Sequence, residues 1–271
     1  MEIKQKRWHN LIGINDKDLP WLKFKYLYNF IKSKKWKVLE VGCWSWKNLR
    51  SLWYYTKGLQ LYWLDIDKDA IAEWEKLYGK FINFYCASWD NMPFKENYFD
   101  YIIISDYLEH VSDDNLAICE MHRVLKKWWF IHAFIPCEWQ KFGIYWIFKK
   151  IFWFNIKKTW GHTQFFTKQL IKKKLKAQWF VIKDIKYSYH VFWQFMDFLL
   201  YSLLLNKAIA RLRRNKNKYY NDNKISKSWL GSIAFNSLLS IANYIAYIES
   251  SLFKKVSFGG MWMHLILNKI K

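Results

Sequence analysis

Residues 37–135 alternate between short apolar runs and amphipathic stretches, and this alternation constrains the fold more than any other feature. The apolar runs are rich in β-branched and aromatic residues, as is typical of buried strands. They lie at 37–41, 60–65, 81–86, 100–105 and 130–135. Helical patterns separate them at 46–55, 67–78 and 113–127, the last with acids at its start and lysines at its end. The rhythm predicts an α/β domain with a parallel sheet and right-handed crossovers.

The flanking segments divide the rest of the chain. A helix is predicted at about 21–33, a basic amphipathic helix at 167–178, a sixth strand at 179–189 and a last strand at 261–270. The residues between the last two strands are mostly apolar with helical patterns. The predicted divisions are an N-terminal helical segment at 1–36, a core at 37–189, a helical insertion or lid at 190–258 and a returning strand within 259–271.

One segment of the insertion, residues 229–248, carries no charge over 20 residues. That length could just span a bilayer. Polar residues nevertheless recur every three or four positions and form one narrow stripe on a helix. A wide apolar face then favours a helix buried against the domain or acting as a lid, ahead of a helix lying in a membrane interface and a spanning helix. The stripe consists of Ser232, Asn236, Ser240, Asn243 and Tyr247.

The chain is strongly basic, with 44 Lys and Arg against 22 Asp and Glu and a formal net charge of +22. This charge fits a nucleic acid, an anionic membrane or simply a lysine-rich surface. The four cysteines are far apart and form no CxxC pair, so we expect a reducing compartment and no structural zinc. The first ten residues lack the apolar stretch of a signal peptide, which indicates a cytoplasmic protein.

Several motifs appear in order along the predicted core. The sequence VLEVGCWSWKNL at 38–49 closes the first strand and opens a helix. With Gly in place of Trp44 and Trp46, it resembles the first motif of the class I S-adenosylmethionine (SAM)-dependent methyltransferases, in the branch related to ubiquinone biosynthesis (methyltransferase type 11). Further resemblances follow in register, and several ordered motifs are stronger evidence than one glycine loop. They lie at 62–67, 87–111, 122–136 and 161–180.

This resemblance implies a Rossmann-like, seven-stranded sheet of order 3-2-1-4-5-7-6, flanked by helices, with the helical insertion before an antiparallel last strand. It also implies that SAM is the cofactor, bound at the carboxyl ends of the strands. Glu40 would receive polar groups of SAM, Gly42 would allow close approach of the backbone, and Asp65 would accept hydrogen bonds from the ribose diol. The further predicted cofactor residues are Trp44, Trp46, Ile66, Ser88, Trp89 and Ser105.

Candidate catalytic residues follow the fourth strand. Asp106, Glu109 and His110 form a D-x-x-E-H pattern at the start of the next predicted helix, where positions i, i+3 and i+4 face one side. We predict a base or substrate contact from His110 with Asp106, against the alternative that these residues only cap the helix or serve the structure. Some ubiquinone-type relatives have a similar E-x-x-E-H pattern that binds a divalent cation, so the three residues are weak candidates for holding one, but we expect no metal. His162 is a further candidate for contact with the substrate, against the more common structural role.

Tryptophan stands at positions where this family carries glycine, and the chain has 19 Trp but only 9 Gly. Glycine usually makes up about 7% of a protein. We hypothesise that UGA codons, which some bacterial lineages read as glycine, were translated as tryptophan. The chain as written is then expected to bind SAM poorly. The positions are Trp36, Trp44, Trp46, Trp63, Trp89, Trp128, Trp129, Trp139, Trp179 and Trp193.

The sequence thus predicts a SAM-dependent methyltransferase acting on a small-molecule or lipid-like acceptor, at oxygen. Because the insertion leaves the end of the sixth strand, it starts on the cofactor side of the sheet, and its basic stretch at 211–218 fits an anionic membrane surface. The protein would then be cytoplasmic and peripheral at the inner face of the membrane. The alternatives are a nucleic-acid methyltransferase, disfavoured because SDYL at 105–108 replaces an amine-methylating motif, and a non-catalytic module for attachment.

Overall fold

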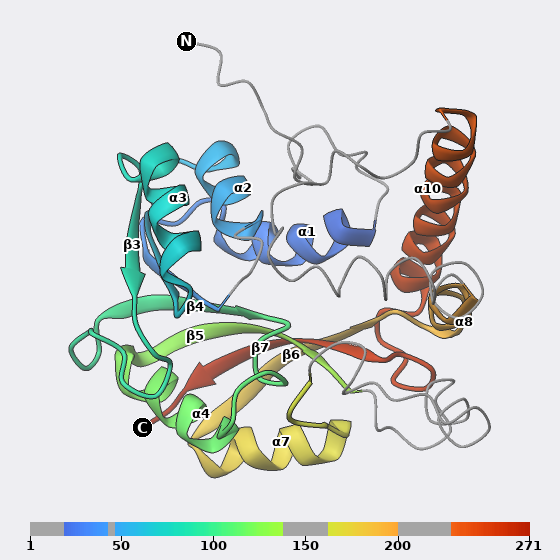
Figure 1. Ribbon diagram of the computed structural model, residues 1–271. Helices are drawn as coiled ribbons and strands as arrows, with labels where there is room; N and C mark the ends of the chain where they lie inside the picture. Colours follow the sequence, from blue (N-terminus) through green and yellow to red (C-terminus); the bar gives the residue numbers. More distant parts are fainter. Residues whose placement is uncertain (1–18, 43–46, 138–161, 200–228) are drawn as a thin grey trace.

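A computed structural model describes residues 19–42, 47–137, 162–199 and 229–271 (Figure 1). Its centre is one sheet of seven strands in the order β3-β2-β1-β4-β5-β7-β6. Strand β7 runs antiparallel to both neighbours, while the other pairs are parallel. This confirms the predicted order and the reversed last strand. The strands are β1 (Lys37–Val41), β2 (Gln60–Asp65), β3 (Ile82–Cys86), β4 (Phe99–Ser105), β5 (Leu125–Pro136), β6 (Phe180–Ser188) and β7 (Trp262–Lys269).

Helices cover both faces of the sheet. Figure 1 shows α1 (Leu19–Ile31), α2 (Lys47–Tyr55) and α3 (Lys68–Tyr78) on one face, with α4 (Asp114–Val124) and α7 (Lys168–Ala177) on the other. Helices α8 (Val191–Leu199) and α10 (Trp229–Leu252) stand at one end of the sheet, where α10 contacts α1 and α8. Because β6 runs parallel to β5, α8 leaves the sheet at the edge where β1 and β4 end, as predicted for the insertion.

Two apolar cores follow from the alternation of side chains along each strand. In β1, Val38 belongs to the core under α1, α2 and α3, whereas Leu39 and Val41 belong to the core that includes residues of α4 and α7. Each of these three residues is wholly buried. The sheet is therefore covered on both faces, which explains why its strands are continuous apolar runs.

The predicted helix at 113–127 is shorter than expected. Helix α4 ends at Val124, and Leu125 is already extended and begins β5. Lys126 therefore lies in a strand, where its Nζ donates to Asp100 Oδ1 over 2.6 Å. The expectation of lysines at the helix end was wrong, because Val124 and Leu125 are both buried and the chain enters the sheet directly. Arg123 supplies the positive charge in the last turn instead.

Helix α10 also departs from expectation. In the described parts of the chain, no helix combines the length and apolar character that crossing a membrane requires, so the spanning alternative for 229–248 was wrong. Over its C-terminal half, small residues face the domain: Ala242 and Ala246 are buried, and Ala246 clusters with Leu22 of α1. The larger apolar side chains are exposed instead of buried, because alanines allow the two helices to approach closely. These are Ile241, Tyr244, Ile245, Ile248 and Leu252.

Candidate functional site

The carboxyl ends of β1, β2 and β4 meet at one edge of the sheet. Glu40 pairs in register with Trp63 of β2 and with Ile103 of β4. Beyond the strands, the backbone N–H of Gly42 donates to the carbonyl of Leu64, the residue before Asp65, over 2.9 Å. Glu40 and Asp65 therefore lie on neighbouring strands at a common edge, as a shared cofactor site requires.

The Glu40 carboxylate is wholly buried and holds the start of α2. It accepts hydrogen bonds from Asn48 Nδ2 over 2.6 Å and from the backbone N–H of Leu49 over 3.2 Å. Asn48 Nδ2 also donates to Ser105 Oγ at the end of β4 over 3.2 Å. Asn48 thus joins two predicted cofactor residues, a role that sequence reasoning missed. The sequence feature that could have revealed this role is an amide side chain in the first turn of the helix that follows the motif loop.

Gly42 occupies a position that only glycine fits. Its φ is +63°, and a Cβ built there would lie 2.0 Å from Cδ2 of Tyr107. The close approach that Gly42 allows is therefore made here by the ring of Tyr107, a second residue that the sequence analysis did not identify. Burial, together with the negative charge of Asp65, raises the pKa of Tyr107. The phenol consequently remains a neutral group beside Asp65.

Asp65 combines a buried acceptor with an exposed apolar neighbour. Its side chain is 7% exposed, and Oδ1 accepts the backbone N–H of Asp67 over 3.1 Å. Burial raises the pKa of Asp65, while backbone hydrogen bonds from Asp67 and Ile66 oppose the increase. Ile66 is 69% exposed. A carboxylate beside an accessible apolar side chain fits the ribose and the adenine of a nucleoside, so these residues suit the predicted cofactor.

The other predicted cofactor residues differ in how far the structure describes them. Ser88 and Trp89 follow β3 and are half-buried, and Trp89 packs against the core. Their segment is joined to β2, because the N–H of Ala87 donates to the Asp65 carbonyl over 3.0 Å. Trp44 and Trp46 lie outside the described residues.

The D-x-x-E-H residues do not share one helix face, contrary to expectation. Helix α4 begins only at Asp114, because Asp113 caps it by accepting the N–H groups of Asn115 and Leu116. Residues 106–112 form a loop, and Asp106 has a positive φ of 50°, which a helix start does not allow. The loop separates Asp106 from Glu109 and His110, and the two ends of the motif take different partners.

Asp106 is held by two other elements. Its Oδ2 accepts from Lys23 Nζ of α1 over 3.1 Å, and its Oδ1 accepts from Trp262 Nε1 of β7 over 3.0 Å. Trp262 stacks on Phe134 with ring centroids 6.2 Å apart, and Tyr189 lies 4.3 Å from Trp262. An aromatic cluster from β5, β7 and the residue that follows β6 thus adjoins a half-exposed carboxylate at the predicted cofactor edge.

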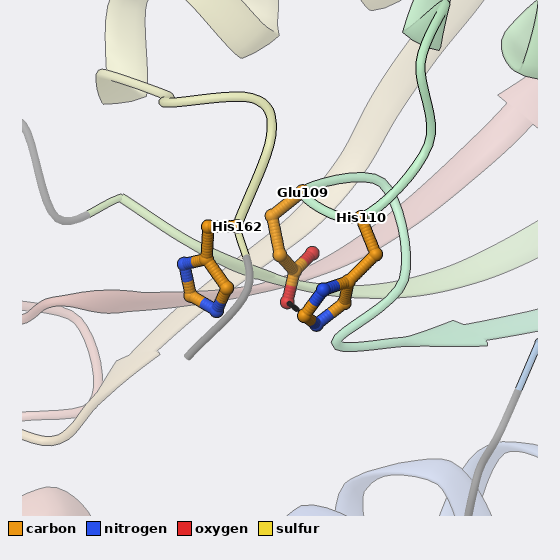
Figure 2. A group of neighbouring side chains, drawn as sticks. All are labelled: Glu109, His110 and His162. Atoms are coloured by element: carbon orange, nitrogen blue, oxygen red, sulfur yellow. Dashed lines mark ion pairs between the residues drawn. The ribbon is translucent and has the colours of Figure 1, made fainter. Parts of the chain in front are cut away.

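Glu109 and His110 meet His162, which precedes α7 (Figure 2). Glu109 and His162 are buried, whereas His110 is exposed. His110 Nε2 lies 3.9 Å from Glu109 Oε1, and the rings of His110 and His162 are 4.9 Å apart at nearly right angles. Sequence reasoning named all three residues but did not group them, because His162 is distant along the chain.

The described tryptophans at family glycine positions fall into two kinds. Trp128 has a φ of +69° and Trp179 a φ of +61°, a backbone conformation that large side chains rarely adopt. Both indoles are largely exposed, at 61% and 49%. Trp63, by contrast, is wholly buried in β2 and packs edge-on against Phe84. Backbone geometry thus favours glycine at two of these positions.

Comparisons with known proteins agree with this fold. A family described as a methyltransferase domain matches residues 39–128. Phosphoethanolamine N-methyltransferase 2 of Haemonchus contortus, solved in complex with S-adenosyl-L-methionine, is similar with a TM-score of 0.57 and 16% identity, over 92% of this chain and 52% of that one. The YcgJ protein of Bacillus subtilis has a TM-score of 0.56 and 13% identity, over 92% and 99% of the two chains.

The same fold also occurs in the cyclase SpnF, with a TM-score of 0.56 and 15% identity, over 91% of this chain and 79% of that one. No curated protein sequence matches this chain. At such identities the solved structures establish the fold alone, and the acceptor has to be argued from the site.

Proposed function

The chain carries a class I SAM-dependent methyltransferase domain, and on that premise we propose that it methylates a hydrophobic, lipid-like acceptor at oxygen. We further propose that it works in the cytoplasm at the inner face of a membrane. When bound, SAM supplies an electrophilic methyl carbon on a sulfonium. The fold's own contribution is to hold and align the reactants.

Cofactor binding is assigned to the edge formed by β1, β2 and β4. Asp65 would accept the ribose hydroxyls, Ile66 would pack on adenine, and Gly42 would admit the cofactor close to the backbone. Glu40 and Ser105 are held together by Asn48, which keeps the ends of β1 and β4 in fixed positions. The ring of Tyr107 fills the space over Gly42, so it must either pack against the bound SAM or move aside.

Acceptor binding is assigned to the aromatic cluster beside Asp106. The rings of Phe134, Tyr189 and Trp262 offer apolar surface, and Asp106 offers a carboxylate within the same hydrogen-bonded group. A hydroxyl acceptor has to lose a proton during methyl transfer, and a carboxylate or an imidazole can take it. Asp106 and His110 are the candidates for this step.

The observation that carries the lipid assignment is the exposed apolar row of α10, defined as Ile241, Tyr244, Ile245, Ile248 and Leu252. Large apolar side chains on one helix face mark a surface that contacts protein or membrane. Lys254 and Lys255 lie just beyond the helix and are exposed, with Lys255 also paired to Asp184, and the chain carries a formal net charge of +22. Basic residues beside an apolar helix face favour an anionic lipid surface.

Vesicle sedimentation tests the membrane part of the proposal without requiring SAM. The whole chain should sediment with vesicles containing phosphatidylserine and stay in solution with vesicles of phosphatidylcholine alone. Ile248→Glu/Leu252→Glu should lower the bound fraction at least about tenfold, because charged side chains would have to enter the lipid. Leu116→Glu changes a similarly exposed leucine on α4 and should leave binding unchanged.

Methyl transfer tests the acceptor. With radiolabelled SAM and membrane lipid extract, the Trp44→Gly/Trp46→Gly protein should label an organic-soluble product whose methyl group is on oxygen, as identified by mass spectrometry. Labelling of water-soluble compounds only would contradict a lipid-like acceptor. Methylation of RNA with a steep salt dependence would instead support the nucleic-acid alternative.

A further inference from the structure

The side chain of Lys23 in α1 lies inside the aromatic cluster that we assign to the acceptor. Its Nζ is 3.4 Å from the ring centroid of Phe134 and 5.3 Å from that of Tyr189. The same Nζ donates to Asp106 Oδ2 over 3.1 Å. A cation that meets both an aromatic face and a carboxylate is attracted by each of them. The surface proposed for the acceptor is therefore already covered by a side chain of the protein itself.

The covered surface belongs to the sheet and its carboxyl edge. Phe134 of β5 pairs in register with Ser105 of β4, and its carbonyl accepts the backbone N–H of Asp106 over 3.0 Å. Trp262 of β7 donates to the other oxygen of the Asp106 carboxylate. Asp106 and Phe134 are thus held together beside Ser105, a predicted cofactor residue. Lys23, by contrast, reaches them from a helix that covers one face of the sheet (Figure 1).

Withdrawal of the ammonium does not require α1 to move. Leu22 and Phe24, on either side of Lys23, are buried and anchor the helix. The lysine side chain itself is 25% exposed, and its flexible four-carbon stem can swing toward solvent. An ion pair at a half-exposed carboxylate is also weak, so a ligand that competes for the same surface can displace it.

Helix α1 also adjoins the helix that we propose to contact the membrane. Leu22 forms an apolar cluster with Ala246 of α10, and Tyr189 packs against the same cluster. Tyr189 therefore adjoins both the ammonium of Lys23 and the inner face of α10. The exposed apolar row lies on the other face of α10. A lysine side chain that leaves the aromatic cluster is then released beside the helix that carries this row.

We propose that Lys23 is an internal occupant of the acceptor site, and that an anionic membrane displaces it when the lipid-like acceptor binds. This inference rests on the proposed function, because it concerns the same site and the same lipid surface. Lys23 and the acceptor compete for the same rings, so the acceptor-bound state separates the ammonium from Asp106. Anionic headgroups attract the released ammonium. The lipid surface therefore favours the open state over the closed one, as such a displacement requires.

Displacement of Lys23 also prepares Asp106 for its proposed role. In the closed state, Oδ2 of Asp106 accepts from Lys23 and Oδ1 accepts from Trp262. Once the ammonium has left, Oδ2 can accept the proton of an acceptor hydroxyl. Away from a membrane, the ammonium keeps the rings covered. Lys23 thus links the arrival of lipid to the exposure of the candidate base.

Binding of a short, neutral lipid in solution tests the competition without a membrane and without SAM. The probe is dihexanoylglycerol, and calorimetric titration of the whole chain measures its affinity. Lys23→Met removes the ammonium but keeps an unbranched stem, so it should bind the probe at least about tenfold more tightly. Lys23→Arg keeps a cation and should bind the probe as weakly as the unmodified chain does. Lys25→Met changes an exposed lysine of the same helix and should have no effect.

Acylation by an amine-reactive reagent, followed by peptide mass spectrometry, tests the displacement itself. In the chain alone, Lys23 should react at least about fivefold more slowly than Lys25, because its amine is held by Asp106. Vesicles of phosphatidylserine with diacylglycerol should remove most of this difference. Vesicles of phosphatidylcholine should leave it unchanged, and so should Ile248→Glu/Leu252→Glu in the presence of phosphatidylserine.

The outcomes separate this inference from the proposed function. The inference is overturned if Lys23→Met binds dihexanoylglycerol no more tightly than the unmodified chain, or if Lys23 stays equally slow to react in the vesicle-bound chain. Either result would leave methylation of a lipid at oxygen intact, because the radiolabel assay does not depend on where Lys23 lies. Tighter binding by Lys23→Met without any labelled lipid would contradict the proposed reaction and support the competition for the site.

Discussion

At the scale of single residues, three tryptophans that stand where this family carries glycine have different surroundings. Trp128 and Trp179 have positive φ values, while Trp63 fills a buried place in β2. Gly42 also has a positive φ, and the ring of Tyr107 covers it through a contact that joins two loops.

Replacing the two strained tryptophans with glycine should stabilise the chain. A non-glycine residue at positive φ costs about 1–3 kcal/mol, and both indoles are largely exposed, so Trp128→Gly and Trp179→Gly should each raise the free energy of unfolding by about 1 kcal/mol. Trp63→Gly is the contrasting variant and should lower it by about 3–5 kcal/mol through the cavity it leaves. Chemical denaturation measures all three, and a clear loss of stability in Trp128→Gly would disprove the strain argument.

The gene itself tests the decoding hypothesis. Codons 44, 46, 128 and 129 should be UGA, while tryptophans outside the family glycine positions, such as Trp262, should be encoded by UGG. Sequencing of the source DNA gives the answer. UGG at those four codons would rule out mistranslation and make the indoles genuine.

At the scale of elements, the strands were predictable and the loops were not. The run at 60–65 became β2 with the same bounds, because a strand buried on both faces is a continuous apolar run. The helix predicted at 113–127 ends early, because the helical spacing of apolar residues does not show where a buried helix gives way to a buried strand. The D-x-x-E-H residues were expected at the start of this helix, although the helical pattern itself began only at residue 113, where Asp113 caps the helix.

Asn48 should prove to be the link between β1, α2 and β4. Asn48→Ala removes the donor to the buried Glu40 carboxylate and to Ser105, so we expect a loss of about 1.5–3 kcal/mol in unfolding free energy. SAM affinity should fall as well, at least about tenfold in a glycine-restored background. Asn83→Ala removes a side-chain bond to the Leu61 carbonyl at an exposed site and is the matched control. Equal behaviour of the two variants would refute the special role of Asn48.

At the scale of the whole molecule, the family resemblance predicted the order of the strands in the sheet. It did not predict that two histidines of the sheet would be buried. His132 of β5 and His264 of β7 lie on paired strands, with ring centroids 6.4 Å apart. Burial lowers the pKa of both, and it brings that of His132 to about 3, with Lys186 adding to the effect. Helix α10 also shows that a sequence pattern does not identify packing partners. Its periodicity predicted an amphipathic helix, but not that alanines would face the domain.

Lowering the pH should therefore destabilise the folded protein at pH values well above those at which carboxylates titrate. The unfolded imidazole has a pKa near 6.5, so between pH 6.5 and 3 the unfolded chain binds more protons than the folded one. The stability contributed by neutral His132 is complete above pH 6.5 and falls by about 1.4 kcal/mol per pH unit below it. Unfolding free energies at pH 7, 6 and 5 should show a slope that His132→Asn reduces by about one proton. An unchanged slope would show that His132 is not buried as described.

The account depends most on one claim, that the edge carrying Gly42 and Asp65 binds SAM. Calorimetric titration of three proteins tests it: the chain as written, Trp44→Gly/Trp46→Gly, and that double variant with Asp65→Ala. We predict that the double variant binds SAM, and that the other two bind it at least about tenfold more weakly. A folded double variant that does not bind SAM, or Asp65→Ala with undiminished affinity, would contradict the claim.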